Sequence, residues 1–379
     1  MIEPFVALLI AAIGTLLLTP PVIRLAERCG AMDEPGGRKL HDCPTPRLGG
    51  VALGATFVLV GLVALGLVPH LRASFEQNEP FWVALALGTL LVFLVGLYDD
   101  VWHAGVATKF LVQFAAAGIV MTYGGIRIEQ LGIPFDGVVS LGWLWVPLTA
   151  LWIVGVTNAF NLIDGLDGLA GGVAFISSMT LFTVALLGSE RYRIVLVTAV
   201  LAGGLLGFLR YNRHPARIFL GDCGSMMIGF LLAVLSAVGS VKKSTALALL
   251  IPILIVGVPV FDTLYAMARR LFKKLVVERD FSPGALRAMF KADRAHIHHV
   301  LLGMGYTYRK TVFVLYAMSA ILGLFAIAAV IVDNDRISFG LMLVGVMGFI
   351  AVRQFGGMRI LANGREKEHS ENGDGGGDK

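Results

Sequence analysis

The chain has 379 residues, of which 56% are hydrophobic and only 15% are charged, and its mean hydropathy is +0.78. A soluble domain carries about 25% charged residues, so this composition excludes a cytosolic globular enzyme, a disordered chain and a fibrous protein. The net charge of +5 does not indicate a nucleic-acid partner, because basic loops of a membrane protein produce the same excess. We therefore expect an all-α polytopic membrane protein.

Apolar stretches of about 20 residues, long enough to cross a bilayer as helices, recur along the chain. We predict eleven transmembrane helices, at residues 3–23, 48–69, 81–98, 107–124, 141–159, 170–188, 193–210, 224–241, 245–266, 311–332 and 337–355. None shows the alternation of a transmembrane β-strand. Residues 1–360 are expected to form one transmembrane domain, and the Gly-rich residues 361–379 a disordered cytoplasmic tail.

The distribution of basic residues predicts the orientation. Most of the 31 lysines and arginines fall on the side of the first loop. This bias predicts a periplasmic N-terminus and a cytoplasmic C-terminus in a bacterial inner membrane. The outer loops are short and chemically sparse, so we expect the active face to be cytoplasmic. Its loops would be residues 24–47, 99–109, 158–171, 210–223 and 267–310.

Carboxylates gather at the inner span ends. Asp99 and Asp100 close the third span, and two adjacent carboxylates beside a bilayer indicate a nearby cation. Asp222 lies in a Gly-Asp-Cys-Gly-Ser turn before the eighth span, which suits a metal ligand. The alternatives are a solvated helix end for the pair and a helix N-cap for Asp222. Lys109 could pair with these acids or with a phosphate.

Residues 158–172 hold a second polar group. Asp164 and Asp167 are three residues apart and would share a helix face, and Asn158 and Asn161 show the same spacing. Polar atoms at a span end are costly unless they are used. The alternative is that Gly and Asp residues simply cap a helix end.

Two neighbouring loops carry groups that suit a nucleotide and its phosphates. In residues 210–230, Phe219 could stack on a flat ring and Asn212 could bond to a base edge. In residues 38–50, Arg47 belongs to a Pro-rich basic loop that suits anionic head groups. An ordinary basic cytoplasmic loop is the alternative for the latter.

Three histidines, His296, His298 and His299, follow Asp293 in the long inner loop. We expect a short helix capped by Asp293 that carries them. They could bind a transition metal, hold phosphates or relay protons.

The acids and basic groups together predict phosphoryl transfer with a divalent cation. Each contact between a carboxylate and a phosphate costs about 4 kcal/mol at about 4 Å and an effective dielectric of about 20. An anionic substrate therefore needs a cation between the charges, and Mg²⁺ fits, with Mn²⁺ as an alternative. No Walker A motif is present, which argues against an ATP-driven enzyme.

The ordered motifs resemble the polyprenyl-phosphate N-acetylhexosamine-1-phosphate transferases of glycosyltransferase family 4. The matching segments are PRLGG at 46–50, GLYDD at 96–100, NAFNLIDGLDGLAGG at 158–172, FLGDCGSMMIGF at 219–230, PVFDTLYAMARR at 259–270 and DRAHIHH at 293–299. The resemblance implies transfer of a sugar-1-phosphate from a UDP-sugar to undecaprenyl phosphate, with release of UMP. The histidine block resembles the branch that uses UDP-N-acetylglucosamine. Because the peptidoglycan branch has three consecutive histidines, the phospho-MurNAc-pentapeptide transferase is the alternative.

The resemblance also implies residue roles. The catalytic set is Asp99, Asp100, Asp222, His296, His298 and His299, with the three aspartates as the metal ligands. Asp164, Asp167, Asn212 and Phe219 would hold the uridine end, while the histidines, Lys109, Arg47 and Arg294 would neutralise phosphates. Asn158, Asn161, Asp262 and Asp293 complete the substrate-binding set.

Two other classes of protein remain as alternatives. An ion-coupled transporter would need acids near mid-span and repeated broken helices, whereas here the acids lie at inner span ends. A scaffold without chemistry conflicts with the density of Asp, Asn and His beside the bilayer. The sequence leaves a homodimer open.

Overall fold

The computed structural model describes residues 2–35, 43–133, 137–188, 192–239, 247–280, 282, 296–332, 334 and 336–354. Nine helices within these ranges are long and apolar enough to cross a membrane. This confirms the prediction of an all-α polytopic membrane protein. The predicted tail at residues 361–379, and Asp293 and Arg294, lie outside the described residues.

The long helices follow the predicted spans closely. They are α1 (Glu3–Cys29), α2 (Gly49–Leu67), α4 (Glu79–Trp102), α6 (Trp145–Ile163, preceded by the single turn η1 at Gly142–Leu144), α7 (Leu169–Leu187), α8 (Tyr192–Asn212), α9 (Gly221–Gly239), α14 (Tyr308–Val332) and a last helix, Arg336–Gln354. The span predicted at 107–124 is the shorter helix α5 (Val106–Thr122).

The span predicted at 245–266 is not one helix. It is divided into α10 (Leu247–Ile255) and α11 (Gly257–Phe272). Pro252 inside α10 lacks a backbone donor, and Val256 has φ −104° and ψ 23°, outside helical geometry. A chain of apolar residues alone does not reveal such a break. The number of membrane crossings therefore stays a prediction.

Several short elements were not predicted from the sequence. They are the antiparallel pair β1 (Met32–Asp33) and β2 (Thr45–Pro46), the hairpin β3 (Gln130–Ile133) and β4 (Gly137–Ser140), the helix α3 (Pro69–Gln77), and a π-helical turn at Lys273–Val277 that continues α11. A short histidine-bearing helix was expected, and α13 (Ile297–Gly303) confirms it. The predicted cap by Asp293 is wrong, because α13 starts at Ile297 and His296 is its N-cap residue.

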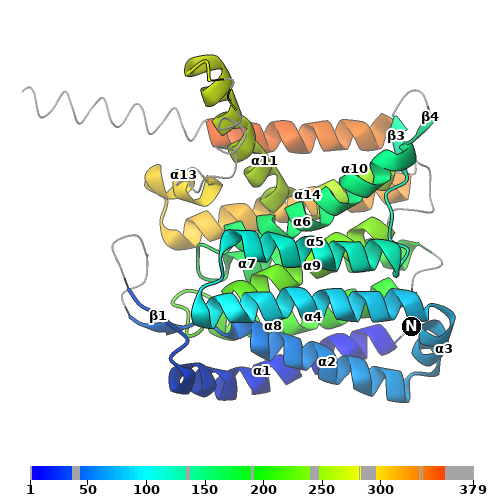
Figure 1. The fold of residues 1–379 in the computed structure, drawn as a ribbon, viewed down its shortest axis with the longest axis vertical. Coiled ribbons are helices and arrows are strands. Elements are labelled where there is room, and N and C mark those ends of the chain that lie inside the picture. The colour runs from blue at the N-terminus through cyan, green and yellow to red at the C-terminus, as the bar shows by residue number, and fades with distance from the viewer. Residues whose placement is uncertain are drawn as a thin grey trace, which may run out of the picture.

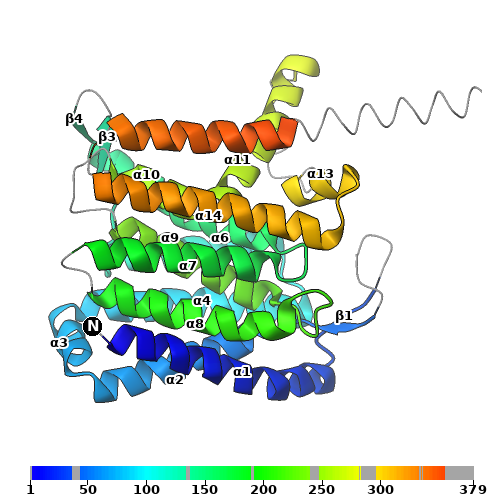
Figure 2. The same ribbon diagram turned by 180° about the vertical axis from the view of Figure 1, so that it is seen from behind.

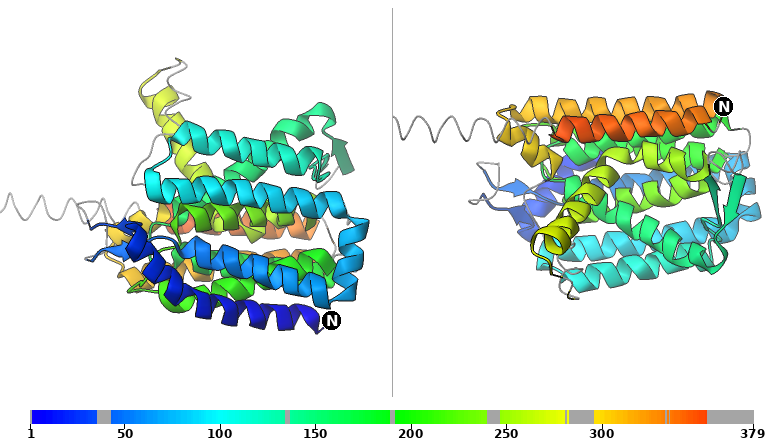
Figure 3. Two further views of the ribbon diagram at one scale, coloured as in Figure 1. Left: turned by 60° about the horizontal axis from the view of Figure 1, so that its bottom comes forward. Right: turned by 90° about the horizontal axis from the view of Figure 1, so that it is seen from above.

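The long helices lie side by side, so the bundle has two distinct ends (Figure 1). One end carries β1 and α13, and we call it the α13 end; the other carries α3 and the β3–β4 hairpin (Figures 1 and 2). The α11 helix runs obliquely to its neighbours and leaves the bundle near the α13 end (Figure 3). Every loop in which the sequence placed functional residues begins or ends at the α13 end.

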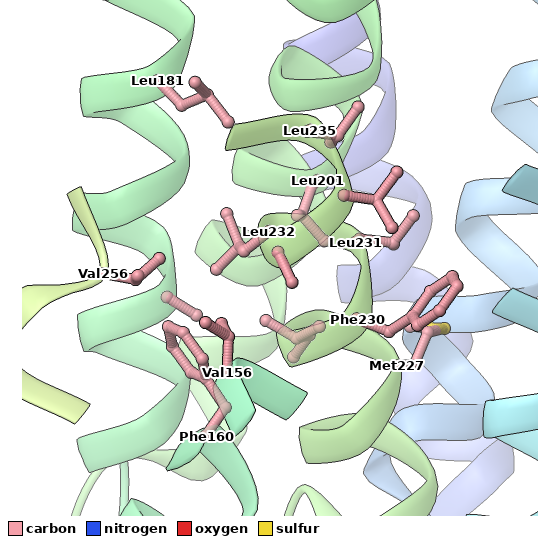
Figure 4. Close-up of a cluster of buried hydrophobic side chains, with 14 of the residues drawn as sticks. Val156, Phe160, Leu181, Leu201, Met227, Phe230, Leu231, Leu232, Leu235 and Val256 are labelled. Carbon is pink, nitrogen blue, oxygen red and sulfur yellow. The ribbon is translucent and has the colours of Figure 1, made fainter. Parts of the chain in front are cut away.

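Helix α9 lies at the centre of the bundle. Its most apolar window is 83% buried, against 22% for the last helix, which faces outward. Phe230, Leu231 and Leu232 of α9 are fully buried and point toward neighbouring helices in Figure 4. The peripheral helices expose leucine and valine side chains, as expected where lipid replaces water as the solvent. The central position of α9 fixes Asp222, in its first turn, with respect to α2, α4 and α6.

Candidate active site

The site is built where the loop before α2 meets the loop before α9. The Phe219 N–H donates to the Pro46 carbonyl at 2.7 Å, and the Gly49 N–H donates back to the Phe219 carbonyl at 3.0 Å. Gly50 donates in the same way to Leu220 at 2.8 Å. These bonds join two motifs that are far apart in the sequence, and Phe219 is half-buried at their junction.

Asp100 holds the start of α9 in place. Its carboxylate is buried and accepts the backbone N–H of Asp222 at 2.8 Å and that of Cys223 at 3.0 Å. This is an N-cap supplied by another helix, and it satisfies donors that a helix start leaves unpaired. Asp100 therefore positions Asp222, and both of its oxygens are engaged by the chain itself.

Lys109 lies between two other carboxylates. Its Nζ donates to Asp99 Oδ2 at 2.7 Å and to Asp222 Oδ2 at 2.5 Å. All three side chains are partly exposed, at 20%, 18% and 27% for Lys109, Asp99 and Asp222. The other Asp99 oxygen accepts the Ala104 N–H at 2.7 Å. Lys109 thus joins the end of α4 to the start of α9, which is one of the two pairings that the sequence left open for it, and the predicted metal ion stays a prediction.

Asp164 adds a carboxylate with no partner of its own. It follows the last residue of α6, and no hydrogen bond or ion pair reaches its side chain within the described part of the chain. Burial raises the pKa of Asp164 well above its ordinary value, and the negative charges of Asp222 and Asp100 raise it further. The cluster therefore has more negative charge than Lys109 balances.

The two asparagines of α6 face other helices. Asn158 Nδ2 donates to Gln113 Oε1 of α5 at 2.5 Å, and Asn161 Nδ2 donates to Ser225 Oγ of α9 at 3.0 Å. Both side chains therefore link α6 to helices that carry Lys109 and Asp222.

Asp167 and Asn212 join the loop after α6 to the loop after α8. Asn212 is buried, accepts the Gly168 N–H at 3.1 Å and donates to the Ile218 carbonyl at 2.9 Å. Asp167 Oδ2 contacts His214 Nδ1 at 2.8 Å and accepts the Ala216 N–H at 3.1 Å. Both side chains are engaged within the protein, so any role in binding uridine requires other atoms of these loops or a rearrangement.

Arg47 connects the basic loop to the carboxylates. Its Nε donates to the Asp100 backbone carbonyl at 3.0 Å, while Nη1 contacts Asp33 at 3.4 Å and Nη2 contacts His103 at 3.4 Å. The guanidinium group is partly exposed at the α13 end.

The histidines are held by a separate buried network around Asp262 of α11. Asp262 Oδ2 contacts His296 Nδ1 at 2.7 Å, and Oδ1 accepts the Ile297 N–H at 2.8 Å at the start of α13. Arg353 of the last helix contacts Oδ1 at 2.5 Å and stacks on Tyr265 with its Cζ 4.1 Å from the ring centre. Asp262 therefore caps and orients the histidine helix.

His298 faces the carboxylate loop in an uncharged state. Burial, together with the neighbouring His299, lowers the pKa of His298 to about 3. An alanine methyl at Gly165 would lie 2.8 Å from His298 Nε2, which places this ring against the residue that follows Asp164. At neutral pH the ring can act as a hydrogen-bonding group but carries no charge toward a phosphate. His299 is half-buried beside it, with ring centres 4.2 Å apart.

The fold brings some predicted residues together and separates others. Asp99, Asp100, Asp222 and Lys109 form one contact cluster, and Asp164 is coupled to it by charge. Asp262 and His296 form the second network. No set of three or more His, Cys, Asp or Glu side chains is preassembled as a metal cage among the described residues. A metal here would require its ligands to reorganise around Lys109.

Sequence reasoning missed Arg353, His214 and Tyr308. The signal for Arg353 was available, because a charged residue inside a predicted span is costly without a buried partner. Tyr308 accepts the Asp167 N–H and stacks on His214 with ring centres 4.3 Å apart. No sequence pattern indicated this contact between the start of α14 and the loop after α8.

Comparison with known proteins identifies relatives along most of the chain. Residues 82–240 match the sequence profile of glycosyl transferase family 4. The chain is 36% identical over 348 residues to a probable undecaprenyl-phosphate N-acetylglucosaminyl 1-phosphate transferase of Bacillus subtilis, covering 92% of this chain and 90% of that protein. It is 36% identical over 357 residues to a decaprenyl-phosphate N-acetylglucosaminephosphotransferase of Mycobacterium tuberculosis. That match covers 88% of this chain and 84% of the relative.

A third relative is more distant. It is a phospho-N-acetylmuramoyl-pentapeptide-transferase of Acetivibrio thermocellus, 31% identical over 346 residues, which cover 86% of this chain and 96% of that protein. The identity to the N-acetylglucosamine enzymes is higher, in agreement with the histidine block. These matches, together with the motifs that meet at one end of the bundle, show that the chain belongs to glycosyl transferase family 4.

Proposed function

We propose that the protein transfers N-acetylglucosamine-1-phosphate from UDP-N-acetylglucosamine to undecaprenyl phosphate and releases UMP. This would be the first membrane step in the synthesis of a cell-envelope polysaccharide. The proposal draws on the names of the relatives at 36% identity. The observation that carries it is the contact of Lys109 with Asp99 and Asp222, beside the unpaired carboxylate of Asp164.

Mg²⁺, or Mn²⁺, fits this cluster by charge and donor chemistry. Asp164 has no partner among the described residues, and Asp99 and Asp222 would each release an oxygen if Lys109 moved away, whereas both oxygens of Asp100 accept backbone N–H groups of α9. The expected ligands are therefore Asp99, Asp164 and Asp222, with Asp100 as the anchor. A divalent ion would neutralise the phosphates and polarise a phosphoryl oxygen.

The residues of the chain would align the two substrates for direct attack. An oxygen of the lipid phosphate forms a bond to the sugar-bearing phosphorus, and the bond from that phosphorus to the UMP oxygen breaks. One phosphoanhydride replaces another, so the step is close to reversible and needs no covalent enzyme intermediate. Lys109 would turn from its carboxylates to the transferred phosphate.

We propose that the α13 end faces the cytoplasm of a bacterial inner membrane. Basic residues gather in the helix ends and loops at this end, including Arg28 in the last turn of α1, Arg47 before α2 and Arg213 after α8. This bias supports cytoplasmic placement, where UDP-sugars are made.

The test is release of UMP by the purified full-length protein in detergent. Undecaprenyl phosphate, UDP-N-acetylglucosamine and Mg²⁺ should give UMP, and Asp222→Asn should lower kcat by at least about 100-fold. Asp280→Asn, which changes a partly exposed acid outside the site, is the matched control and should have no effect. Full turnover of Asp222→Asn would refute the metal assignment.

The choice of donor separates the two transferase branches. Turnover with UDP-MurNAc-pentapeptide and none with UDP-N-acetylglucosamine would establish the alternative, the peptidoglycan reaction. Absence of UMP release with a panel of UDP-sugars would refute the reaction class.

A further inference from the structure

A basic cavity lies at the α13 end, between the loop after α8 and the start of α14. It has a volume of about 600 Å³, and its lining includes Arg210, Arg213, Arg217 and Arg309. We call it the arginine groove. In Figure 2 the end of α8 and the start of α14 lie at the same end of the bundle. The contacts of Lys109 that carry the proposed function lie outside this cavity, although Asp167, which the resemblance assigns to substrate binding, belongs to its lining.

The arginines of the groove have no counter-charge of their own. No hydrogen bond or ion pair engages any of the four guanidinium groups within the described ranges of the chain. Among the described residues of the lining Asp167 is the only acid, and its carboxylate is already bonded to His214 and to the Ala216 N–H. Like charges that share a cavity repel one another, so the groove is suited to an anion. Arginine binds phosphate oxygens in pairs, which makes a phosphate group the best-matched anion.

Besides Arg309, helix α14 contributes apolar side chains to the groove. Val312 and Phe313, one turn into the membrane-spanning helix α14, belong to the lining, and Phe313 is 72% exposed. Tyr308 stacks on His214 between these side chains and the loop. Arginines at a helix end beside an exposed apolar surface match the boundary between lipid head groups and acyl chains. A soluble phosphate compound would leave the apolar side chains without a partner.

We propose that the arginine groove binds the phosphate group of an anionic phospholipid, whose acyl chains lie along the Val312 and Phe313 side of α14. The inference does not rest on the proposed reaction. The Asp99, Asp222 and Lys109 side chains are not part of the lining. Of the loop that follows α6 and carries Asp164, Asp167 is the described residue that lines the groove. A bound lipid would therefore stabilise this loop without occupying the proposed active site.

Lipid binding is tested by titrating the full-length protein in detergent with phosphatidylglycerol or phosphatidylcholine of equal chain length and measuring bound lipid by native mass spectrometry. Phosphatidylglycerol should bind more tightly than phosphatidylcholine. One arginine near a membrane surface contributes about 1 kcal/mol, which is about fivefold in affinity. Arg213→Gln should weaken phosphatidylglycerol binding about fivefold and the double variant with Arg217→Gln about 25-fold, with phosphatidylcholine binding unchanged.

Arg28→Gln is the matched control, because Arg28 is exposed at the same end of the bundle but outside the groove. It should bind phosphatidylglycerol as the unmodified protein does. Equal affinity for the two lipids, or an equal loss in Arg28→Gln, would overturn the proposal. Displacement of phosphatidylglycerol by inorganic phosphate or by UDP-N-acetylglucosamine would also overturn it, by assigning the groove to a soluble anion or to the donor. Since Arg213 and Arg217 are exposed, both variants should keep the melting temperature of the protein.

Discussion

The buried ion pair between Arg353 and Asp262 is expected to be essential for the stability of the α13 end. The side chains are 5% and 3% exposed, so neither charge is solvated by water. Replacing Arg353 by Met would leave a buried carboxylate whose partners, among the described residues, are His296 and the Ile297 N–H. Removing one partner of a buried pair costs about 3–5 kcal/mol, because the other charge stays desolvated.

We therefore expect Arg353→Met to lower the free energy of unfolding by about 3 kcal/mol or more. Arg353→Lys keeps the charge but loses the stacking on Tyr265, so its loss should be smaller. The measurement is reversible unfolding in mixed micelles, followed by circular dichroism. Arg336 is exposed at the other end of the same helix, so Arg336→Met is the control. It should change the free energy of unfolding by at most about 0.5 kcal/mol.

A double-mutant cycle separates the ion pair from general packing. The neutral pair Asp262→Asn with Arg353→Met leaves no unpaired charge, so its loss should be smaller than the sum of the two single losses. Strictly additive losses, or a wild-type stability for Arg353→Met, would refute the reasoning.

Two further predictions concern the carboxylate cluster. Because its pKa is raised on folding, ionisation of Asp164 opposes the fold, and the metal-free protein should lose stability as the pH rises from below about 4 through the folded pKa. Asp164→Asn should therefore raise the melting temperature of the metal-free protein at pH 7 and weaken its pH dependence; a lower melting temperature would contradict this. Gly221 has φ +75°, and an added Cβ would overlap the Arg47 carbonyl oxygen. Gly221→Ala should therefore lower the free energy of unfolding, measured by chemical denaturation, by about 3 kcal/mol. Gly125→Ala, with φ +67° but open space around it, should cost only about 1 kcal/mol, and equal losses would show that the close packing is irrelevant.

The sequence by itself determined the fold class and the residues that gather at one end. Segments of about 20 apolar residues must form helices in lipid, because no water satisfies their backbone groups. Carboxylates, asparagines and histidines beside the bilayer cost desolvation free energy unless they bind a partner or a ligand. This argument identified residues such as Asp99, Asp164 and His298 as candidates. The ordered motifs were specific enough to indicate the family that the relatives then established.

Only the tertiary structure decided what each of these side chains does. The sequence could not show that Asp100 caps α9 while Asp99 contacts Lys109, because adjacent carboxylates have the same chemistry and differ only in direction. It could not pair Arg353 with Asp262 across 91 residues, or place four arginines from the end of α8, the loop after it and the start of α14 around one cavity. Local patterns encode helices and their ends, whereas contacts between helices depend on packing over the whole bundle.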